Sequence, residues 1–204
     1  MKINKKKFLY LISPNKVLKT FYRDLIEVFT SNKISFFQLR LKKTSLKNKL
    51  RIAKKIRKIC QKFKVKLLIN DDPSLAKRID ADGCHLGQKD MKINNARKLL
   101  NNKIIGITCH NSIKLAKLAI KNNADYIAFG AFNSSKTKKV KYKANISLIK
   151  KIKKSSNIPI VAIGGIDNLN YKKLLLNKAD FLAISGYVWK NKKLKPLDAI
   201  RELK

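Results

Sequence analysis

Residues 67–91 read LLINDDPSLAKRIDADGCHLGQKDM, and this stretch holds a strand, a helix and a second strand in succession. The run VKLLIN (65–70) is apolar and rich in β-forming residues, as expected of a buried strand. Asp72 followed by Pro73 is typical of a helix start, with an aspartate N-cap and proline at the first helical position. GCHLG (83–87) predicts the next strand. This order predicts two parallel strands joined by a helix.

The same alternation extends along the whole chain. Short β-rich runs lie at 7–13, 34–40, 65–70, 83–87, 103–108, 125–130, 158–164 and 180–185. Segments between them, such as 45–63 and 112–123, carry apolar residues at spacings of three and four, the pattern of an amphipathic helix. Strand then helix, repeated eight times, predicts the α/β class with a parallel sheet closed into a (β/α)8 TIM barrel. At 204 residues the chain is short for such a barrel, so we expect residues 1–204 to form a single domain.

The chain is strongly basic. Its 49 Lys and Arg residues outnumber 12 Asp and Glu residues, which gives a formal net charge of +37. Such a charge favours nucleic-acid binding in general. The lysines, however, are scattered over every segment beside many Asn and Ile residues, and all three residue types have A/T-rich codons. No basic segment interleaves with aromatic residues as a single-strand binding platform requires, so we expect no specific nucleic-acid partner.

The first residues, MKINKKKFLYLISPNK, imitate a signal peptide. Their apolar run, Phe8–Ile12, is shorter than the roughly 7–15 residues of a signal-peptide core, and no small-residue cleavage site follows. Apolar runs elsewhere are strand-sized and far below the roughly 20 residues of a membrane span. We expect a cytoplasmic protein without a membrane partner. The sequence leaves open whether the chain forms a homo-oligomer.

Three cysteines, Cys60, Cys84 and Cys109, form neither a CxxC motif nor a disulfide framework. Two of them precede histidines, and the pairs Cys84-His85 and Cys109-His110 raise the question of a zinc site. Adjacent side chains of a strand point to opposite faces, so both members of a pair rarely reach one metal ion. We therefore do not expect zinc.

Polar residues gather where the second predicted strand ends, in FFQLRLKK (36–43). Gln38, Arg40 and Lys42 alternate with apolar residues, so the period of two places all three on one face. Active sites of TIM barrels lie at the carboxyl ends of the strands, and an Arg fork beside a Lys suits phosphate oxygens. The alternative is a solvated basic end of an edge strand, but a closed barrel has no edge.

Five of the 12 acidic residues lie within 67–91. Asp72 has a local role as a helix N-cap, and Asp80 and Asp82 flank the turn into the next strand, where we expect solvated or turn residues. Asp71 and Asp90 have no such role and follow the third and fourth strands. Two carboxylates beside Arg and Lys suit a Mg²⁺ ion bound together with substrate phosphates.

The last three strand ends predict a second anion site. The loop after the sixth strand carries hydroxyl groups and a cation, in Ser134, Ser135, Thr137 and Lys138. The seventh strand ends in AIGGID and the eighth in AISG. Glycines and a hydroxyl after strands seven and eight match the phosphate site that is frequent there in TIM barrels.

Together these stretches resemble the thiamine-phosphate synthase family. The resemblance runs from LYLIS (9–13) to AISG (183–186) and includes QLRLK, ND with DGCHLGQKD, GITCH, SSKTKK and IPIVAIGGI in the family's order and spacing. It implies an enzyme that joins an aminopyrimidine diphosphate to a thiazole phosphate and releases pyrophosphate. It also implies a dissociative step, in which pyrophosphate leaves and the thiazole nitrogen captures a pyrimidine-stabilised cation.

The resemblance assigns roles to individual residues. Contacts with the pyrimidine diphosphate are implied for Gln38, Arg40, Lys42, Asn70, Thr108 and Lys138. Among these, Arg40, Lys42 and Lys138 are the implied catalytic residues, because with Mg²⁺ they stabilise the charge of the leaving group. The implied Mg²⁺ ligands are Asp71 and Asp90. The implied thiazole phosphate site consists of Ser135, Thr137, Gly165 and the backbone of Ile184 and Ser185.

The chain departs from the family pattern at a few positions. Thr108 stands where the family usually has serine, and Ser135 replaces a threonine; both keep the hydroxyl group. The nearest alternative is a thiazole tautomerase-like barrel enzyme, which transfers protons and needs neither metal nor pyrophosphate. Retention of Asp71, Asp90, Arg40 and Lys42 favours the synthase. His85 is expected to have a packing or strand-end role, because this chemistry needs no proton relay.

Overall fold

The computed structural model describes residues 7–42, 44–134 and 140–204. Within this part of the chain, strands alternate with helices. The strands are β1 (Leu9–Ile12), β2 (Ile34–Leu39), β3 (Lys66–Asn70), β4 (Gly83–Leu86), β5 (Ile104–His110), β6 (Tyr126–Gly130), β7 (Ile160–Ile163) and β8 (Phe181–Ile184). The helices are α1 (Phe21–Thr30), α2 (Leu46–Lys62), α3 (Pro73–Arg78), α4 (Ile93–Leu100), α5 (Ile113–Lys121), α6 (Ile146–Ser155), α7 (Tyr171–Leu176), α8 (Gly186–Trp189) and α9 (Pro196–Arg201).

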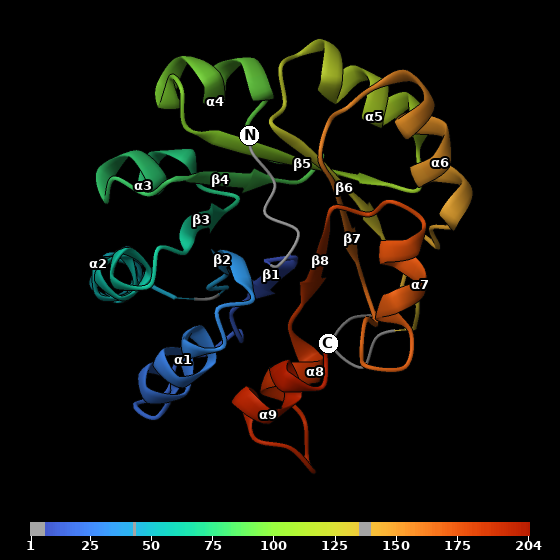
Figure 1. The fold of residues 1–204 in the computed structure, drawn as a ribbon. Helices are drawn as coiled ribbons and strands as arrows, with labels where there is room; N and C mark the ends of the chain where they lie inside the picture. Colours follow the sequence, from blue (N-terminus) through green and yellow to red (C-terminus); the bar gives the residue numbers. More distant parts are fainter. Residues whose placement is uncertain (1–6, 43, 135–139) are drawn as a thin grey trace.

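The strands form a closed barrel in sequence order, and the helices lie around its outside (Figure 1). Each strand pairs in parallel with the next, and β1 pairs with β8 through Leu9 and Leu182 to close the ring. The predicted TIM barrel is confirmed. Every strand lies within its predicted run except β5, which continues to His110 instead of ending at Thr108, with a register shift against β6 between these two residues.

Alternation along the strands produces two apolar layers. Side chains on the outer faces pack against the helices in one large cluster, which includes Phe37, Leu39 and Cys84. Side chains on the inner faces fill the barrel in a second cluster with several aromatic rings, including Tyr10 and Tyr126. Cys84 and its neighbour His85 therefore lie on opposite sides of β4, as the argument against zinc requires.

Three aspartates tie strands together at the end of the barrel opposite the carboxyl ends. Asp82 precedes β4 and accepts hydrogen bonds from the Leu67 backbone N–H (2.9 Å), Arg57 (2.6 Å) and Lys66 (3.0 Å). Asp125 precedes β6 and binds the Ile105 backbone N–H and Arg97, and Asp180 precedes β8 and binds the Ile160 backbone N–H and Lys153. The expectation that Asp82 is a solvated or turn residue is therefore wrong: its side chain is 13% exposed and holds β3, β4 and α2 together.

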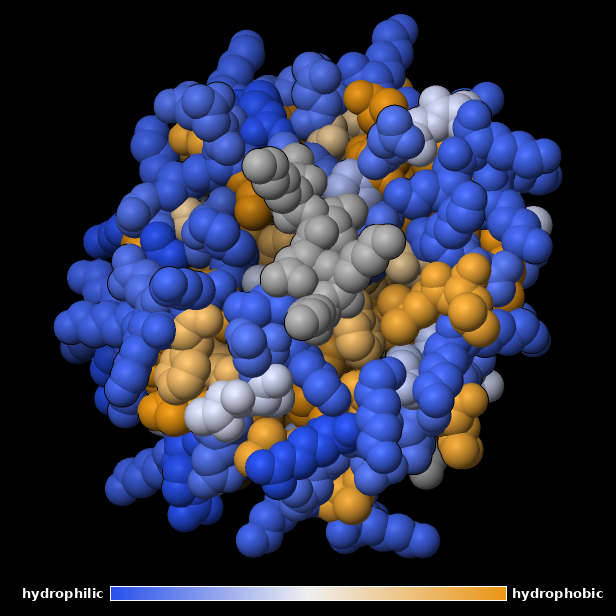
Figure 2. Space-filling model, viewed as in Figure 1, coloured by the Kyte–Doolittle hydropathy of each residue, from blue (hydrophilic) through white to orange (hydrophobic). Residues whose placement is uncertain are grey.

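The surface is largely polar. Figure 2 shows hydrophilic side chains along most of the outline of one face, with apolar side chains in smaller groups between them. In the described part of the chain, none of the helices combines the length and apolar character that crossing a membrane demands.

Gly106 tests the packing of the barrel interior. A Cβ atom at this position would lie 1.8 Å from Cζ of Tyr126. The Tyr126 ring is buried, and hydrogen bonds of its hydroxyl group with Tyr10 and His85 hold it in place. We expect Gly106→Ala to lower the free energy of unfolding by about 1–3 kcal/mol, measured by urea denaturation. Gly87→Ala is the control, because its Cβ atom would meet only the Asp90 carboxylate, at 3.0 Å. Equal stability of Gly106→Ala and wild type would contradict this packing.

Candidate active site

The polar residues of β2 reach the mouth of the barrel at different depths. Gln38 is buried inside the barrel, where its Nε2 donates to the Tyr10 hydroxyl at 2.7 Å. Arg40 follows the strand, and its Nη1 donates to Oδ1 of Asn15 at 2.8 Å, in the loop after β1. Lys42 lies in the loop after β2 and is exposed at the rim. Gln38 therefore points into the barrel, as predicted. Arg40 and Lys42 come after the end of β2 and lie at the rim of the barrel.

The ends of β3 and β4 bring two carboxylates together. Asp71 has a left-handed backbone with φ of 64°, and its N–H donates to the His85 carbonyl oxygen at 2.8 Å. Asp90 lies in the loop after β4, where its Oδ2 accepts from the Gly87 N–H at 2.7 Å. The carboxyl groups of Asp71 and Asp90 lie close enough to affect each other's protonation. Asp72 is the N-cap of α3 and accepts from the Leu75 N–H, as predicted.

This pairing changes the acidity of Asp71. Its pKa is raised to about 6, chiefly because part of the carboxyl group is removed from water, and further because Asp90 hydrogen-bonds with it and repels its negative charge. The positive charge of Lys42 and a hydrogen bond from Asn70 act in the opposite direction. A divalent cation between the two carboxylates would take the place of the proton that they otherwise compete for.

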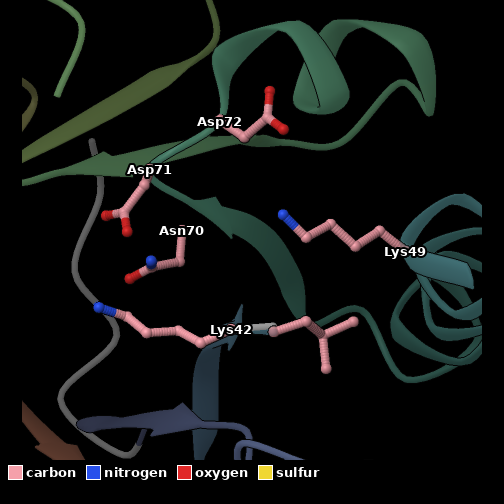
Figure 3. A pocket seen from close by; sticks show the side chains of 6 residues that line it. Lys42, Lys49, Asn70, Asp71 and Asp72 are labelled. Atoms are coloured by element: carbon pink, nitrogen blue, oxygen red, sulfur yellow. The ribbon is translucent and has the colours of Figure 1, made fainter. Parts of the chain in front are cut away.

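A cavity of about 480 Å³ lies beside these residues. It is lined by Leu41, Lys42, Lys49, Asn70, Asp71 and Asp72. Figure 3 shows Lys42 and Asn70 on the same side as the Asp71 carboxylate, Asp72 pointing away from it, and Lys49 reaching in from α2. Sequence reasoning did not identify Lys49, because it lies among other lysines on an amphipathic helix and only its place in the fold distinguishes it.

The carboxylate pair fits a magnesium ion. Among residues 7–42, 44–134 and 140–204, His, Cys, Asp and Glu side chains nowhere gather in threes as a complete metal site. Asp71 and Asp90 alone would supply two carboxylate ligands at the edge of a cavity with lysines. Mg²⁺ commonly binds through one or two carboxylates and keeps its other positions for water and substrate phosphates, which this arrangement leaves room for.

A chain of hydrogen bonds crosses the inside of the barrel below this cavity. It runs from Gln38 to the Tyr10 hydroxyl (2.7 Å), from there to the Tyr126 hydroxyl (2.9 Å), then to Nδ1 of His85 (2.7 Å), and from its Nε2 to Oγ1 of Thr108 (2.7 Å). The Gln38 amide donates to Tyr10, and in the arrangement where each hydroxyl group then donates onward, His85 carries its proton on Nε2. In that arrangement Thr108 keeps its own proton for an acceptor at the mouth.

Burial holds the members of this chain in their neutral forms. His85 is 7% exposed, and its pKa is lowered to about 4 by loss of hydration, although the charge of Asp90 opposes the shift. Burial likewise raises the pKa values of Tyr10 and Tyr126 well above that of a free tyrosine. His85 therefore does more than pack, because it links the inner chain to Thr108. Tyr10 and Tyr126 were not recognised from the sequence, since tyrosines in apolar strands look like ordinary core residues.

The other strand ends contain part of the expected thiazole phosphate site. Gly165 has φ of 61°, and a Cβ atom there would lie 2.1 Å from the Ser134 carbonyl oxygen, so the loop after β7 packs tightly on the loop after β6. Ile184 is buried at the end of β8 and Ser185 follows it, at the start of α8. β7 and β8 are neighbours, with Ile163 paired to Ala183, so the segments that carry Gly165 and Ser185 leave adjacent strands at the same end of the barrel. Ser135, Thr137 and Lys138 lie outside the described residues.

Comparisons with known proteins identify the family of this chain. A family model described as thiamine monophosphate synthase matches residues 9–188. A thiamine-phosphate synthase from Pelagibacter ubique (strain HTCC1062) is 68% identical over the full length of both chains. The thiamine-phosphate synthase of Nitrosomonas eutropha is 44% identical, covering 74% of this chain and 72% of its own.

Solved structures of other proteins share the fold of this chain. Thiamine phosphate pyrophosphorylase from Pyrococcus furiosus superimposes with a TM-score of 0.85 and 28% identity, covering 98% of this chain and 94% of the other. A 3-hexulose-6-phosphate synthase superimposes with a TM-score of 0.70 at 15% identity, covering 96% of this chain and 98% of its own, a similarity of fold alone.

The low pKa of His85 predicts how stability depends on pH. An unfolded histidine binds a proton below about pH 6.5, whereas folded His85 does so only below about pH 4. Between these values the unfolded state holds more protons, so acidification destabilises the fold. From pH 6.5 to 5, this one group should remove about 2 kcal/mol from the free energy of unfolding. Between pH 7 and pH 5, the free energy of unfolding measured by urea denaturation should fall by about 2 kcal/mol less in His85→Gln than in wild type. Equal losses would show that His85 is not held neutral.

Proposed function

The chain belongs to the thiamine monophosphate synthase family, and we propose that it makes thiamine phosphate at the barrel mouth, beside the ends of β2, β3 and β4. It condenses 4-amino-2-methyl-5-(diphosphooxymethyl)pyrimidine with a thiazole phosphate and releases pyrophosphate. The observation that carries this placement is the convergence of Lys42, Asn70 and Asp71 on one cavity, with Asp90 against Asp71. We also propose that the reaction takes place in the cytoplasm.

The leaving group is the part of the substrate that most needs stabilisation. As the carbon–oxygen bond breaks, negative charge grows on the diphosphate, and the catalytic residues Arg40, Lys42 and Lys138 are the proposed partners of that charge. Arg40 uses Nη1 to bind Asn15, which anchors the guanidinium, and among the described residues its side chain has no second hydrogen-bond acceptor, so its other N–H groups can bind phosphate oxygens. Mg²⁺ held by Asp71 and Asp90 would neutralise further charge on the diphosphate.

The pyrimidine ring is proposed to lie over the inner hydrogen-bond chain. Gln38 and Thr108 are its two ends, and Asn70 lies at the cavity between them and the rim. Because buried partners fix both ends, their polar groups are oriented before the substrate arrives, which lowers the cost of binding. Thr108 would offer its free proton to a ring nitrogen.

The thiazole phosphate is proposed to bind across the mouth, in the site formed by Ser135, Thr137, Gly165, Ile184 and Ser185. The tight packing of Gly165 on the Ser134 backbone supports a place for this site between the loops after β6 and β7. From there the thiazole nitrogen would face the cation left by departing pyrophosphate. The tautomerase alternative needs a base at the mouth, and the neutral, buried His85 with a pKa of about 4 is poorly suited to that role.

Turnover tests this function directly. The protein is incubated with both phosphorylated substrates and Mg²⁺, and thiamine phosphate and pyrophosphate are quantified. Both products should appear in equal amounts, neither should form when one substrate is omitted, and EDTA should stop the reaction. Failure to form thiamine phosphate would refute the function, and undiminished turnover in EDTA would refute the role of Mg²⁺.

The carboxylate pair predicts a defined loss of activity. Asp71→Asn and Asp90→Asn should each lower kcat by at least roughly 100-fold, because a metal ligand is removed, and leave thermal stability nearly unchanged. Asp198→Asn, an exposed aspartate on α9, is the control and should retain full activity. Since a proton competes with Mg²⁺ for Asp71, the Mg²⁺ concentration for half-maximal rate should rise as the pH falls through about 6. A loss of folding in both variants, or no pH effect, would contradict this assignment.

Substitutions in the loop after β6 should affect the kinetic constants of the two substrates differently. Thr137→Val removes one charge-assisted hydrogen bond, worth about 1.5–3 kcal/mol, and should raise KM for the thiazole phosphate roughly 10- to 150-fold. KM for the pyrimidine diphosphate should hardly change. Lys138→Ala should instead slow the loss of diphosphate more than it weakens thiazole binding. If Thr137→Val impairs only the diphosphate side, the proposed division of the loop is wrong.

A further inference from the structure

We propose that Lys49, in the first turn of α2, is an additional binding residue for the diphosphate leaving group. This inference rests on the proposed function, because it names one more partner for the same leaving group. It adds a residue from a covering helix to a site whose other proposed members lie at strand ends or in the loops that follow them.

The position of Lys49 follows from the barrel. In a strand–helix unit with parallel strands, the helix after each strand begins at the carboxyl end of that strand. The first turn of α2 therefore lies at the rim, next to the loop that carries Lys42. Lys49 lines the same cavity as Lys42, Asn70 and Asp71, and Figure 3 shows its side chain extending from α2 toward the end of β3. Lys49 is half-buried, whereas Lys47, two residues earlier in the same turn, is exposed.

The charges around Lys49 leave it available for a ligand. Two other half-buried lysines are tied to aspartates, Lys103 to Asp80 and Lys153 to Asp180, and a third, Lys33, donates to the Leu203 carbonyl oxygen at 2.8 Å. Within the described residues, Lys49 forms no ion pair of this kind with a carboxylate. Asp72, the acidic residue that lines the cavity on its side, already accepts the hydrogen bond that caps α3. An ammonium group held at a cavity without a carboxylate partner is the arrangement expected for an anion-binding lysine.

The ligand should be a polyanion that spans the cavity. Lys42 reaches the cavity from the loop after β2, and Lys49 reaches it from α2. Asp71 also lines the cavity, and together with Asp90 it forms the proposed Mg²⁺ site. A diphosphate carries more negative charge than one Mg²⁺ ion neutralises, so its outer phosphate needs further cations. Lysine suits this task, because its flexible stem brings a point charge to an oxygen without a fixed geometry.

Inhibition by the product pyrophosphate tests this inference. Lys49→Gln removes the charge, keeps a polar end and shortens the side chain by one atom, and Lys47→Gln makes the same change at the exposed neighbour. Lys49→Gln should raise the inhibition constant of pyrophosphate and KM for the pyrimidine diphosphate roughly 5- to 20-fold, and flatten their dependence on salt. KM for the thiazole phosphate and the melting temperature should stay unchanged. Lys47→Gln should match wild type in all four quantities, and Lys49→Arg should restore most of the pyrophosphate affinity.

The outcomes separate this inference from the function on which it rests. If wild type forms no thiamine phosphate, the proposed function fails first. If wild type turns over and Lys49→Gln binds pyrophosphate as wild type does, Lys49 is not part of the leaving-group site. A lowered melting temperature with an unchanged inhibition constant would show a structural role instead. Equal effects of Lys47→Gln and Lys49→Gln would show that only the overall charge of the protein matters, which also overturns the inference.

Discussion

The pairing of β1 with β8 closes the sheet, and the site depends on this closure. In an open sheet, only neighbouring strand ends would lie close together. In the closed barrel, all strands run in the same direction and their carboxyl ends form one ring. Gln38 from β2, Asn70 from β3 and Thr108 from β5 therefore surround one mouth. The aspartates that hold the opposite end, such as Asp82 with Arg57, keep the strands in register without taking part in the chemistry.

The inner hydrogen-bond chain connects this scaffold to the site. Polar groups inside a barrel are costly unless each has a partner, and here two tyrosines and His85 satisfy one another between Gln38 and Thr108. Because the chain links β1, β2, β4, β5 and β6, a displacement of one strand would break a buried hydrogen bond. The rigid interior thus orients Gln38 and Thr108, whereas the ligands of the charged diphosphate lie at the rim, where water and Mg²⁺ can enter.

Much of this architecture could be predicted from the sequence, because the determining signals are local. Apolar runs and helical periodicity predicted the strands and their covering helices, and Asp72-Pro73 predicted the start of α3. Features that depend on contacts between distant segments could not be predicted. The bulge that lengthens β5 to His110 depends on its register with β6, and the burial of Asp82 depends on Arg57 from α2. Lys49 differs from neighbouring lysines only through the cavity it faces.

The central claim is that metal and diphosphate bind together at the carboxyl ends of β2, β3 and β4. A crystal structure with Mn²⁺ and pyrophosphate tests it most directly, because anomalous scattering locates Mn²⁺ in the Mg²⁺ site. We expect one strong anomalous peak with Asp71 and Asp90 as protein ligands, and pyrophosphate bridging this ion and Lys42. A metal ion bound elsewhere, or pyrophosphate at the opposite end of the barrel near Asp82, would contradict the account.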